Sequence, residues 1–215
     1  MKKLLCPSMM CADFSNLKKN VEELDQAGSD IFHMDFMDGS FVPNFGMGLQ
    51  DFELVRSVTD KPLDVHLMIQ EPYRYVEKFA DLGADIIYIH PEADQQPART
   101  LDAIHQKGKR AGIAINPSTS VEMIQDLLAL VDYVMVMTVH PGFSGQQYLE
   151  YTYPKIEKLV ALSKNSDYKV MVDGAISPKK VIKLSEVGVT GFVLGTSALF
   201  GKPETYSETI AKLRM

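Results

Sequence analysis

The sequence has no tryptophan, only two cysteines and no excess of positive charge. Cys6 and Cys11 form no Cys-x-x-Cys pair, so a disulfide framework is excluded and a cytoplasmic location is the default expectation. The formal net charge of -6 disfavours a nucleic-acid partner, because proteins that neutralise many phosphates are usually basic. No apolar run approaches the roughly 18–20 residues that a membrane helix needs, so no membrane partner is expected.

Linkers, low-complexity segments and long charge runs are also missing. The apolar stretch at the start stops at Pro7 and is too short for the core of a signal peptide. Hydrophobic residues make up 46% and charged residues 23% of the chain, which is typical of a globular protein. We therefore expect one sizeable domain over residues 1–215.

Short apolar runs alternate with amphipathic segments along the whole chain. Eight runs rich in Val and Ile predict strands at residues 4–7, 31–35, 63–68, 86–90, 111–115, 133–138, 170–173 and 192–194. Between them, spacings such as Leu17, Val21 and Leu24 predict helices. Ser120 is expected to cap one helix at its start, and Gly188 to end another in a left-handed conformation.

Eight strands that alternate with helices predict a parallel α/β protein, and the length fits a compact (β/α)₈ TIM barrel of the phosphate-binding type. A doubly wound open sheet is the structural alternative. That fold more often has about five to seven strands, and no Gly-x-Gly-x-x-Gly follows the first strand here.

Polar residues gather at the carboxyl ends of three predicted strands, where barrels carry their catalytic groups. Alternation places His33 and Asp35 on one face of a strand, Asp64 and His66 on one face of the next, and Asp173 ends a third. The two histidines with two of these three carboxylates at the barrel mouth would suit Zn²⁺, Mn²⁺, Fe²⁺ or Co²⁺, and the carboxylates could also form an acid–base pair. The alternative is a set of unrelated polar residues at a solvated rim.

Loops of small residues follow the last three predicted strands, within 138–146, 173–176 and 194–198. Barrels commonly bind phosphate at these loops through backbone N–H groups, which requires no Arg or Lys. Most of the twelve methionines are expected to fill the core. His90 ends the fourth predicted strand and is expected to be a structural, hydrogen-bonding histidine. No partner base marks Cys11 as a nucleophile.

Specific motifs extend over nearly the whole chain, from about Leu5 to Phe200. They are Pro7-Ser8, Asp13-Phe14, the segments 33–39, 41–44, 64–68 and 137–146, His90-x-Glu92, Val172-Asp173-Gly174 and Gly195. On these motifs the chain resembles the ribulose-phosphate 3-epimerase family, which includes the allulose-6-phosphate 3-epimerases. The resemblance implies a (β/α)₈ barrel that holds one divalent metal ion through His33, Asp35, His66 and Asp173. Zn²⁺ is the first expectation for this ion, with Mn²⁺, Fe²⁺, Co²⁺ and Mg²⁺ as alternatives.

The resemblance also implies the reaction, which is the interconversion of D-ribulose 5-phosphate and D-xylulose 5-phosphate. Asp35 and Asp173 would face each other across C3 of the sugar. One would remove the C3 proton, and the other would return a proton to the opposite face. The intermediate would be a cis-enediolate whose O2 and O3 are held by the metal, and a cation there stabilises the developing charge.

Further residues take roles from the same resemblance. Ser8 would contact the substrate, and Met37, Met68 and Met137 would form an apolar cap over the intermediate. The phosphate would be held by Ser144, Gly145, Gln146, Gly174, Ala175, Gly195 and Thr196. The family also suggests a homo-oligomer whose partner molecule is a small ketose phosphate.

Several positions depart from the commoner ribulose-phosphate pattern, among them Met9-Met10-Cys11, Ala175 and the segment 195–200. They look nearer to the allulose-phosphate branch, so the alternative function is a D-allulose 6-phosphate 3-epimerase that gives D-fructose 6-phosphate. The pentulose comes first because that activity is the more widespread in the family. A non-catalytic sugar-phosphate-binding barrel is more distant, since both candidate aspartates are present. Related decarboxylases and aldolases carry Asp-x-Lys-x-x-Asp on the third strand, and Asp64-Val65-His66-Leu67-Met68 has no lysine.

Overall fold

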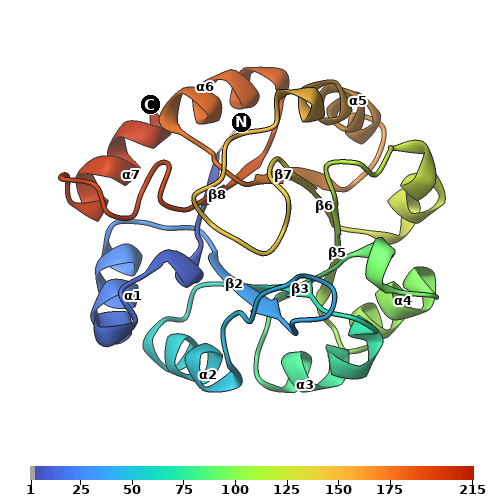
Figure 1. The fold of residues 1–215 in the computed structure, drawn as a ribbon, viewed down its shortest axis with the longest axis horizontal. Helices are drawn as coiled ribbons and strands as arrows, with labels where there is room; N and C mark the ends of the chain where they lie inside the picture. The colour runs from blue at the N-terminus through green and yellow to red at the C-terminus, as the bar shows by residue number, and fades with distance from the viewer. Residues whose placement is uncertain (1–2) are drawn as a thin grey trace.

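The computed structural model describes residues 3–215, which form a ring of eight parallel strands surrounded by helices (Figure 1). The strands are β1 (Leu4–Pro7), β2 (Phe32–Met37), β3 (Leu63–Met68), β4 (Ile86–Ile89), β5 (Arg110–Ile115), β6 (Tyr133–Met137), β7 (Lys169–Asp173) and β8 (Gly191–Leu194). Their order is β1-β8-β7-β6-β5-β4-β3-β2, and a parallel bridge between Ser8 and His33 closes the ring between β1 and β2. The predicted (β/α)₈ barrel is confirmed, and each predicted strand is present within two residues of its expected bounds.

The helices cover the outside of the barrel (Figure 1). They are α1 (Leu17–Gln26), α2 (Leu49–Val58), α3 (Val76–Asp81), α4 (Pro97–Gln106), α5 (Tyr153–Ser163), α6 (Pro178–Val187) and α7 (Tyr206–Arg214). Short 3-10 helices are η1 (Met9–Cys11), η2 (Phe14–Asn16), η3 (Pro72–Tyr75), η4 (Pro91–Ala93), η5 (Glu122–Leu130) and η6 (Glu150–Thr152). None of the helices in residues 3–215 is long and apolar enough to cross a membrane. Residues 1 and 2 of the predicted domain lie outside the described residues.

One predicted helix end is confirmed and another is wrong. Gly188 ends α6 with φ 116°, and its N–H donates to the carbonyl of Leu184. Ser120 caps no helix: Val121 precedes η5, which is a 3-10 helix without a side-chain cap. Within η5 Ile124 is buried, and Leu127, Leu128 and Leu130 are partly buried and pack against the core.

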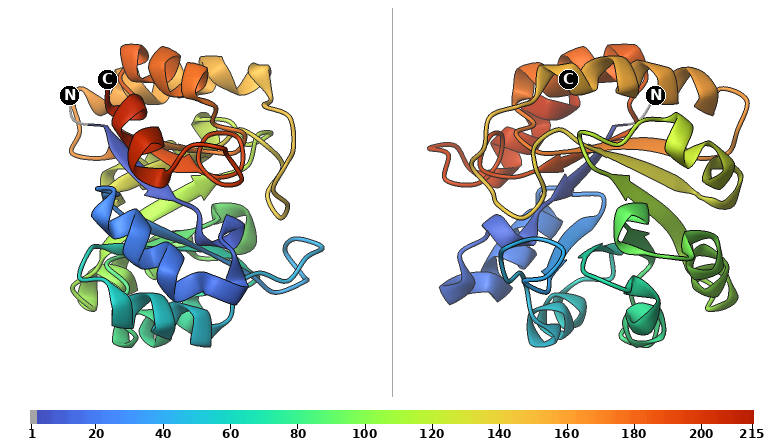
Figure 2. Two further views of the ribbon diagram at one scale, coloured as in Figure 1. Left: turned by 90° about the vertical axis from the view of Figure 1, so that its left-hand side faces the viewer. Right: turned by 45° about the vertical axis from the view of Figure 1, so that its right-hand side comes forward.

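Alternation along the strands separates the packing inside the barrel from the layer between strands and helices. The interior cluster consists of Cys6, Ile31, Ile86, Tyr88, Ala114, Tyr133, Met135, Met171 and Val193. Gly112 and Ala114 on β5 are small, and this leaves room for the rings of Tyr88 and Tyr133, whose centroids are 6.0 Å apart. The filled interior gives the polar residues at the strand ends a rigid base. The loops after β2 and β6 project from one end of the barrel (Figure 2).

We expect Gly112→Ala to destabilise the fold by about 1–3 kcal/mol, as overpacked cores do. The added methyl would lie 2.4 Å from Cδ1 of Tyr88, which is a rigid, enclosed ring. Gly191→Ala is the matched control, because its methyl would meet the flexible side chain of Met171 at 2.1 Å, and a thioether can rotate away. Urea unfolding followed by circular dichroism measures both variants. Equal losses of stability would contradict the role given to the tyrosine ring.

Candidate active site

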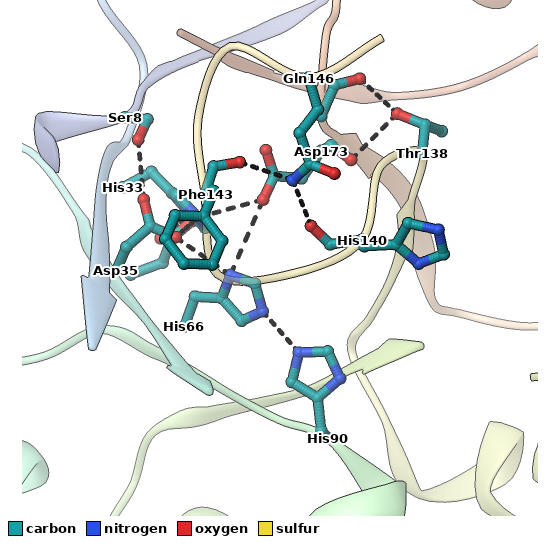
Figure 3. Close-up of polar contacts among 12 residues, drawn as sticks. Ser8, His33, Asp35, His66, His90, Thr138, His140, Phe143, Gln146 and Asp173 are labelled. Carbon is teal, nitrogen blue, oxygen red and sulfur yellow. Dashed lines mark hydrogen bonds and ion pairs between the residues drawn. The ribbon is translucent and has the colours of Figure 1, made fainter. Parts of the chain in front are cut away.

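Four polar side chains converge at the carboxyl end of the barrel (Figure 3). His33 and Asp35 come from β2, His66 from β3 and Asp173 from the end of β7, and one ligand atom of each lies within 4.8 Å of the others. Both imidazole rings are fully buried. The β2–β3 register pairs Asp35 with His66, and alternation keeps His33 on the same face as Asp35. The structure thus brings the four predicted ligand residues together.

Both carboxylates face both histidine rings. Nε2 of His33 lies 3.3 Å from Oδ1 of Asp35 and 3.9 Å from Oδ2 of Asp173. Nδ1 of His66 lies 3.2 Å and 3.8 Å from the same two oxygens. Among the described residues, the buried Nε2 of His33 has no hydrogen-bond partner. Two imidazole nitrogens and two carboxylate oxygens in this arrangement fit a divalent metal ion.

The other ring nitrogen of His33, Nδ1, contacts a buried carboxylate. Nδ1 lies 2.5 Å from Oδ1 of Asp64, a fully buried residue that is paired with His33 in the β2–β3 ladder. A proton on Nδ1 donated to Asp64 leaves Nε2 as the atom that faces the cluster. Burial alone would lower the pKa of His33, but the carboxylates of Asp64 and Asp35 outweigh it and hold that pKa well above its usual value. The alternation of the strand predicted that Asp64 lies on this face, but it did not predict that Asp64 contacts Nδ1 of His33.

The two candidate acid–base residues have pKa values displaced in opposite directions. Burial would raise the pKa of Asp35, but His33 and His66 outweigh it and hold the pKa well below its usual value. Burial raises the pKa of Asp173 to about 7, and the nearby charge of Asp35 adds to the shift. Ser8 donates a 2.7 Å hydrogen bond to Oδ2 of Asp35. Two carboxyl groups in such different states can serve as one base and one acid.

A cavity lies above the cluster and is lined by Asp35, Asp173 and all the residues predicted to bind substrate or phosphate. Those residues are Ser8, Met37, Met68, Met137, Ser144, Gly145, Gln146, Gly174, Ala175, Gly195 and Thr196. His140 and Phe143 of the predicted phosphate loop 138–146 also line the cavity, although no role was predicted for either residue. The amide of Gln146 donates to the carbonyls of His140 and Phe143, at 2.6 and 2.8 Å, so this side chain holds its own loop together (Figure 3).

The loops after β6 and β7 are joined to each other. The hydroxyl of Thr138 lies 3.0 Å from the carbonyl of Asp173 and 2.5 Å from that of Gly174. Gly174 has φ 115°, and a Cβ there would lie 2.5 Å from Cγ2 of Val139. Only glycine fits at that point, so the turn directly after the candidate catalytic Asp173 is tightly constrained.

The chain is similar to known proteins in sequence and in fold. A model of the ribulose-phosphate 3 epimerase family matches residues 4–200. The ribulose-phosphate 3-epimerase of Synechocystis sp. is 41% identical over 98% of this chain and 93% of its own length. The enzyme of the same name from Bacillus subtilis is 38% identical over 98% and 97%. A crystal structure of KGPDC from Streptococcus mutans has a TM-score of 0.73 at 13% identity, covers 99% of this chain and 96% of that one, and shows the fold alone.

Co²⁺ added to metal-free protein should release protons near neutral pH. The raised pKa of His33 means that both of its ring nitrogens hold protons there, and Nε2 must lose its proton to bind a cation. Binding should therefore strengthen as the pH rises from about 6 to about 8. Calorimetric titration in two buffers of different ionisation enthalpy counts the protons. An affinity independent of pH would contradict the assignment.

Proposed function

The chain belongs to the ribulose-phosphate 3-epimerase family, and from this premise we propose that it is an isomerase that interconverts D-ribulose 5-phosphate and D-xylulose 5-phosphate. The observation that carries the proposal is the pair of carboxyl groups in the cluster, Asp35 and Asp173, whose pKa values are displaced in opposite directions. Inversion at one carbon requires a base on one face and an acid on the other, and these two residues supply both.

The proton balance follows from the two ionisation states. Asp35 is ionised near neutral pH and accepts the C3 proton, while Asp173 carries a proton that it delivers to the opposite face of C3. The intermediate between the two transfers is the cis-enediolate. After one turnover the two carboxyl groups have exchanged states, so solvent must restore them before the next turnover in the same direction. The hydroxyl of Ser8 holds the Asp35 carboxylate in place through these steps.

His33, His66, Asp35 and Asp173 would hold a divalent cation, whose charge lowers the free energy of the enediolate oxygens by several kcal/mol. We propose Zn²⁺ as the resident ion, since it accepts nitrogen and oxygen donors alike. The proposal includes a homo-oligomer, which rests on the family resemblance, and a place in cytoplasmic carbohydrate metabolism through the pentose phosphate pathway.

The remaining cavity residues fit a sugar phosphate. The loops after β6, β7 and β8 present Ser144, Gly145, Gly174 and Thr196 to the cavity, and backbone N–H groups in such loops can hold a phosphate. Met37 and Met68 pack with Val42 into a small apolar cluster on the wall beside the carboxylates. This apolar surface would keep water away from the intermediate, which strengthens the electrostatic interactions around it.

The enzyme should prefer D-ribulose 5-phosphate over D-allulose 6-phosphate. The Synechocystis, Bacillus subtilis and Rhodobacter capsulatus relatives are each named ribulose-phosphate 3-epimerase, which does not favour the hexulose alternative. A paired assay of kcat/KM on metal-loaded protein tests this expectation. A higher kcat/KM for the hexulose would overturn the substrate assignment, and activity on neither would favour the non-catalytic alternative.

Asp173→Asn should reduce turnover by about 10²–10⁴-fold, the usual contribution of a general acid or base. In D₂O, Asp35 should still exchange the C3 proton of one epimer, whereas exchange of the other epimer should be lost. Proton NMR of each epimer measures this difference. Asp102→Asn on the exposed face of α4 is the control for the removal of one charge. Near-wild-type turnover, or retained exchange of both epimers, would contradict the role of Asp173.

A further inference from the structure

A chain of polar groups leads from the candidate metal site through the buried rings of His66 and His90, which Figure 3 shows, to Glu92. Nδ1 of His66 faces the cluster, and its Nε2 lies 2.8 Å from Nε2 of His90. His90 follows β4 and is fully buried, and the two rings stack with centroids 5.0 Å apart and an interplanar angle of 27°. At this distance one nitrogen must donate a proton and the other must accept it.

Glu92 lies at the far end of this chain. Its Oε2 is the carboxylate oxygen that faces Nδ1 of His90, at 3.4 Å, and within residues 3–215 this buried nitrogen has no hydrogen-bond partner. Its Oε1 accepts the N–H of Asn116 at 2.8 Å and the hydroxyl of Thr119. Burial would raise the pKa of Glu92, but His90 and these hydrogen bonds outweigh it and lower the pKa to about 2, so the carboxylate can only accept.

The turn at Asn116 and Pro117, which binds Glu92, is itself held by hydrogen bonds. The ammonium group of Lys155, from α5, donates to the carbonyls of Asn116 and Pro117 at 2.9 and 2.8 Å. The Asn116 N–H is therefore a fixed donor to Glu92. It determines which carboxylate oxygen faces the backbone and which faces His90.

These contacts give the chain a direction. A carboxylate that only accepts draws the proton of His90 to Nδ1, which leaves Nε2 of that ring as the acceptor in the contact with His66. His66 must then carry its proton on Nε2, and Nδ1 keeps its lone pair toward the cluster. We propose that Glu92 and His90 are positioning residues that fix the tautomer of His66 in which Nδ1 can bind the metal ion.

The opposite tautomer of His66 would also find a hydrogen-bond partner, so the correct tautomer has to be enforced. Nδ1 of His66 lies 3.2 Å from Oδ1 of Asp35, and a proton on Nδ1 would donate to that carboxylate. His66 would then present no lone pair to a cation. The tautomer of His33 also has to be fixed, and Asp64 does this by direct contact with its ring. For His66, the carboxylate of Glu92 acts through the ring of His90. The inference rests on the metal site proposed above.

Glu92→Gln is the decisive variant. The N–H of Asn116 would keep the amide oxygen of the new side chain, so the amide NH₂ group would face Nδ1 of His90. A donor at that position reverses both histidines and places the proton of His66 on Nδ1. The Kd for Co²⁺ should rise by about 10–100-fold, as is usual when a group that supports a metal ligand is lost. The melting temperature of the metal-free protein should stay near that of the wild type.

Thr119→Val is the matched control, because it removes a hydrogen bond to Glu92 and leaves the carboxylate facing His90. Its Kd for Co²⁺ should stay within a few-fold of the wild type. If Glu92 served packing alone, Glu92→Gln should leave the Kd for Co²⁺ unchanged, because glutamine is nearly isosteric with glutamate. A wild-type Kd for Glu92→Gln, or an equal loss in Thr119→Val, would overturn the proposal. Wild-type protein that binds no Co²⁺ would overturn the metal site itself, and the proposal with it.

A measurement on the unaltered protein does not depend on whether a variant folds. In Zn²⁺-loaded wild-type protein, ¹⁵N-edited NMR of the imidazole rings should find the proton of His90 on Nδ1 and that of His66 on Nε2. A proton on Nε2 of His90 would overturn the proposal, whatever the affinities of the variants.

Discussion

The register between β2 and β3 is the constraint on which the site depends. It pairs His33 with Asp64 and Asp35 with His66, and paired residues of parallel strands point to the same side. One register therefore supplies three of the four candidate metal ligands and the carboxylate below them. A slip of either strand by one residue would turn that strand's polar side chains toward the helices and bring its apolar residues to the mouth.

Burial shifts the pKa values of the clustered side chains, and it also removes the hydration that these polar groups would have in water. Buried imidazole and carboxyl groups lose their contact with water, so each needs a protein partner or a cation. His33 has its partner in Asp64, His66 in His90 and Asp35 in Ser8, each through a polar contact between side chains. Asp173, at the cavity wall, instead has a pKa raised to about 7. The residue with the weakest support in the ionised state is thus the one that carries the transferable proton.

Local patterns predicted the strands and the cluster, because alternation and the rule that barrels act at strand ends need only neighbouring residues. They could not show that Ser8 donates to Asp35, since that contact depends on closure of the ring between β1 and β2. The link from His66 to His90 was equally hidden, because His90 lies past the end of β4 and its ring orientation depends on packing across strands. Ser120 fitted a capping pattern, but the segment after it is a 3-10 helix without a side-chain cap.

The departures that suggested a six-carbon substrate have a physical explanation in the cavity. Ala175 lies on the proposed phosphate loops, and Sγ of Cys11 is 3.3 Å from where a Cβ of Gly195 would be. Both candidate substrates carry the same phosphate, so substitutions at that end say little about the number of carbons. Substrate length corresponds instead to the span from the carboxylates of β2 and β7 to the phosphate loops. Similarity over nearly the whole chain to relatives named ribulose-phosphate 3-epimerase, at 36–41% identity, is therefore a better guide to the substrate than single loop residues.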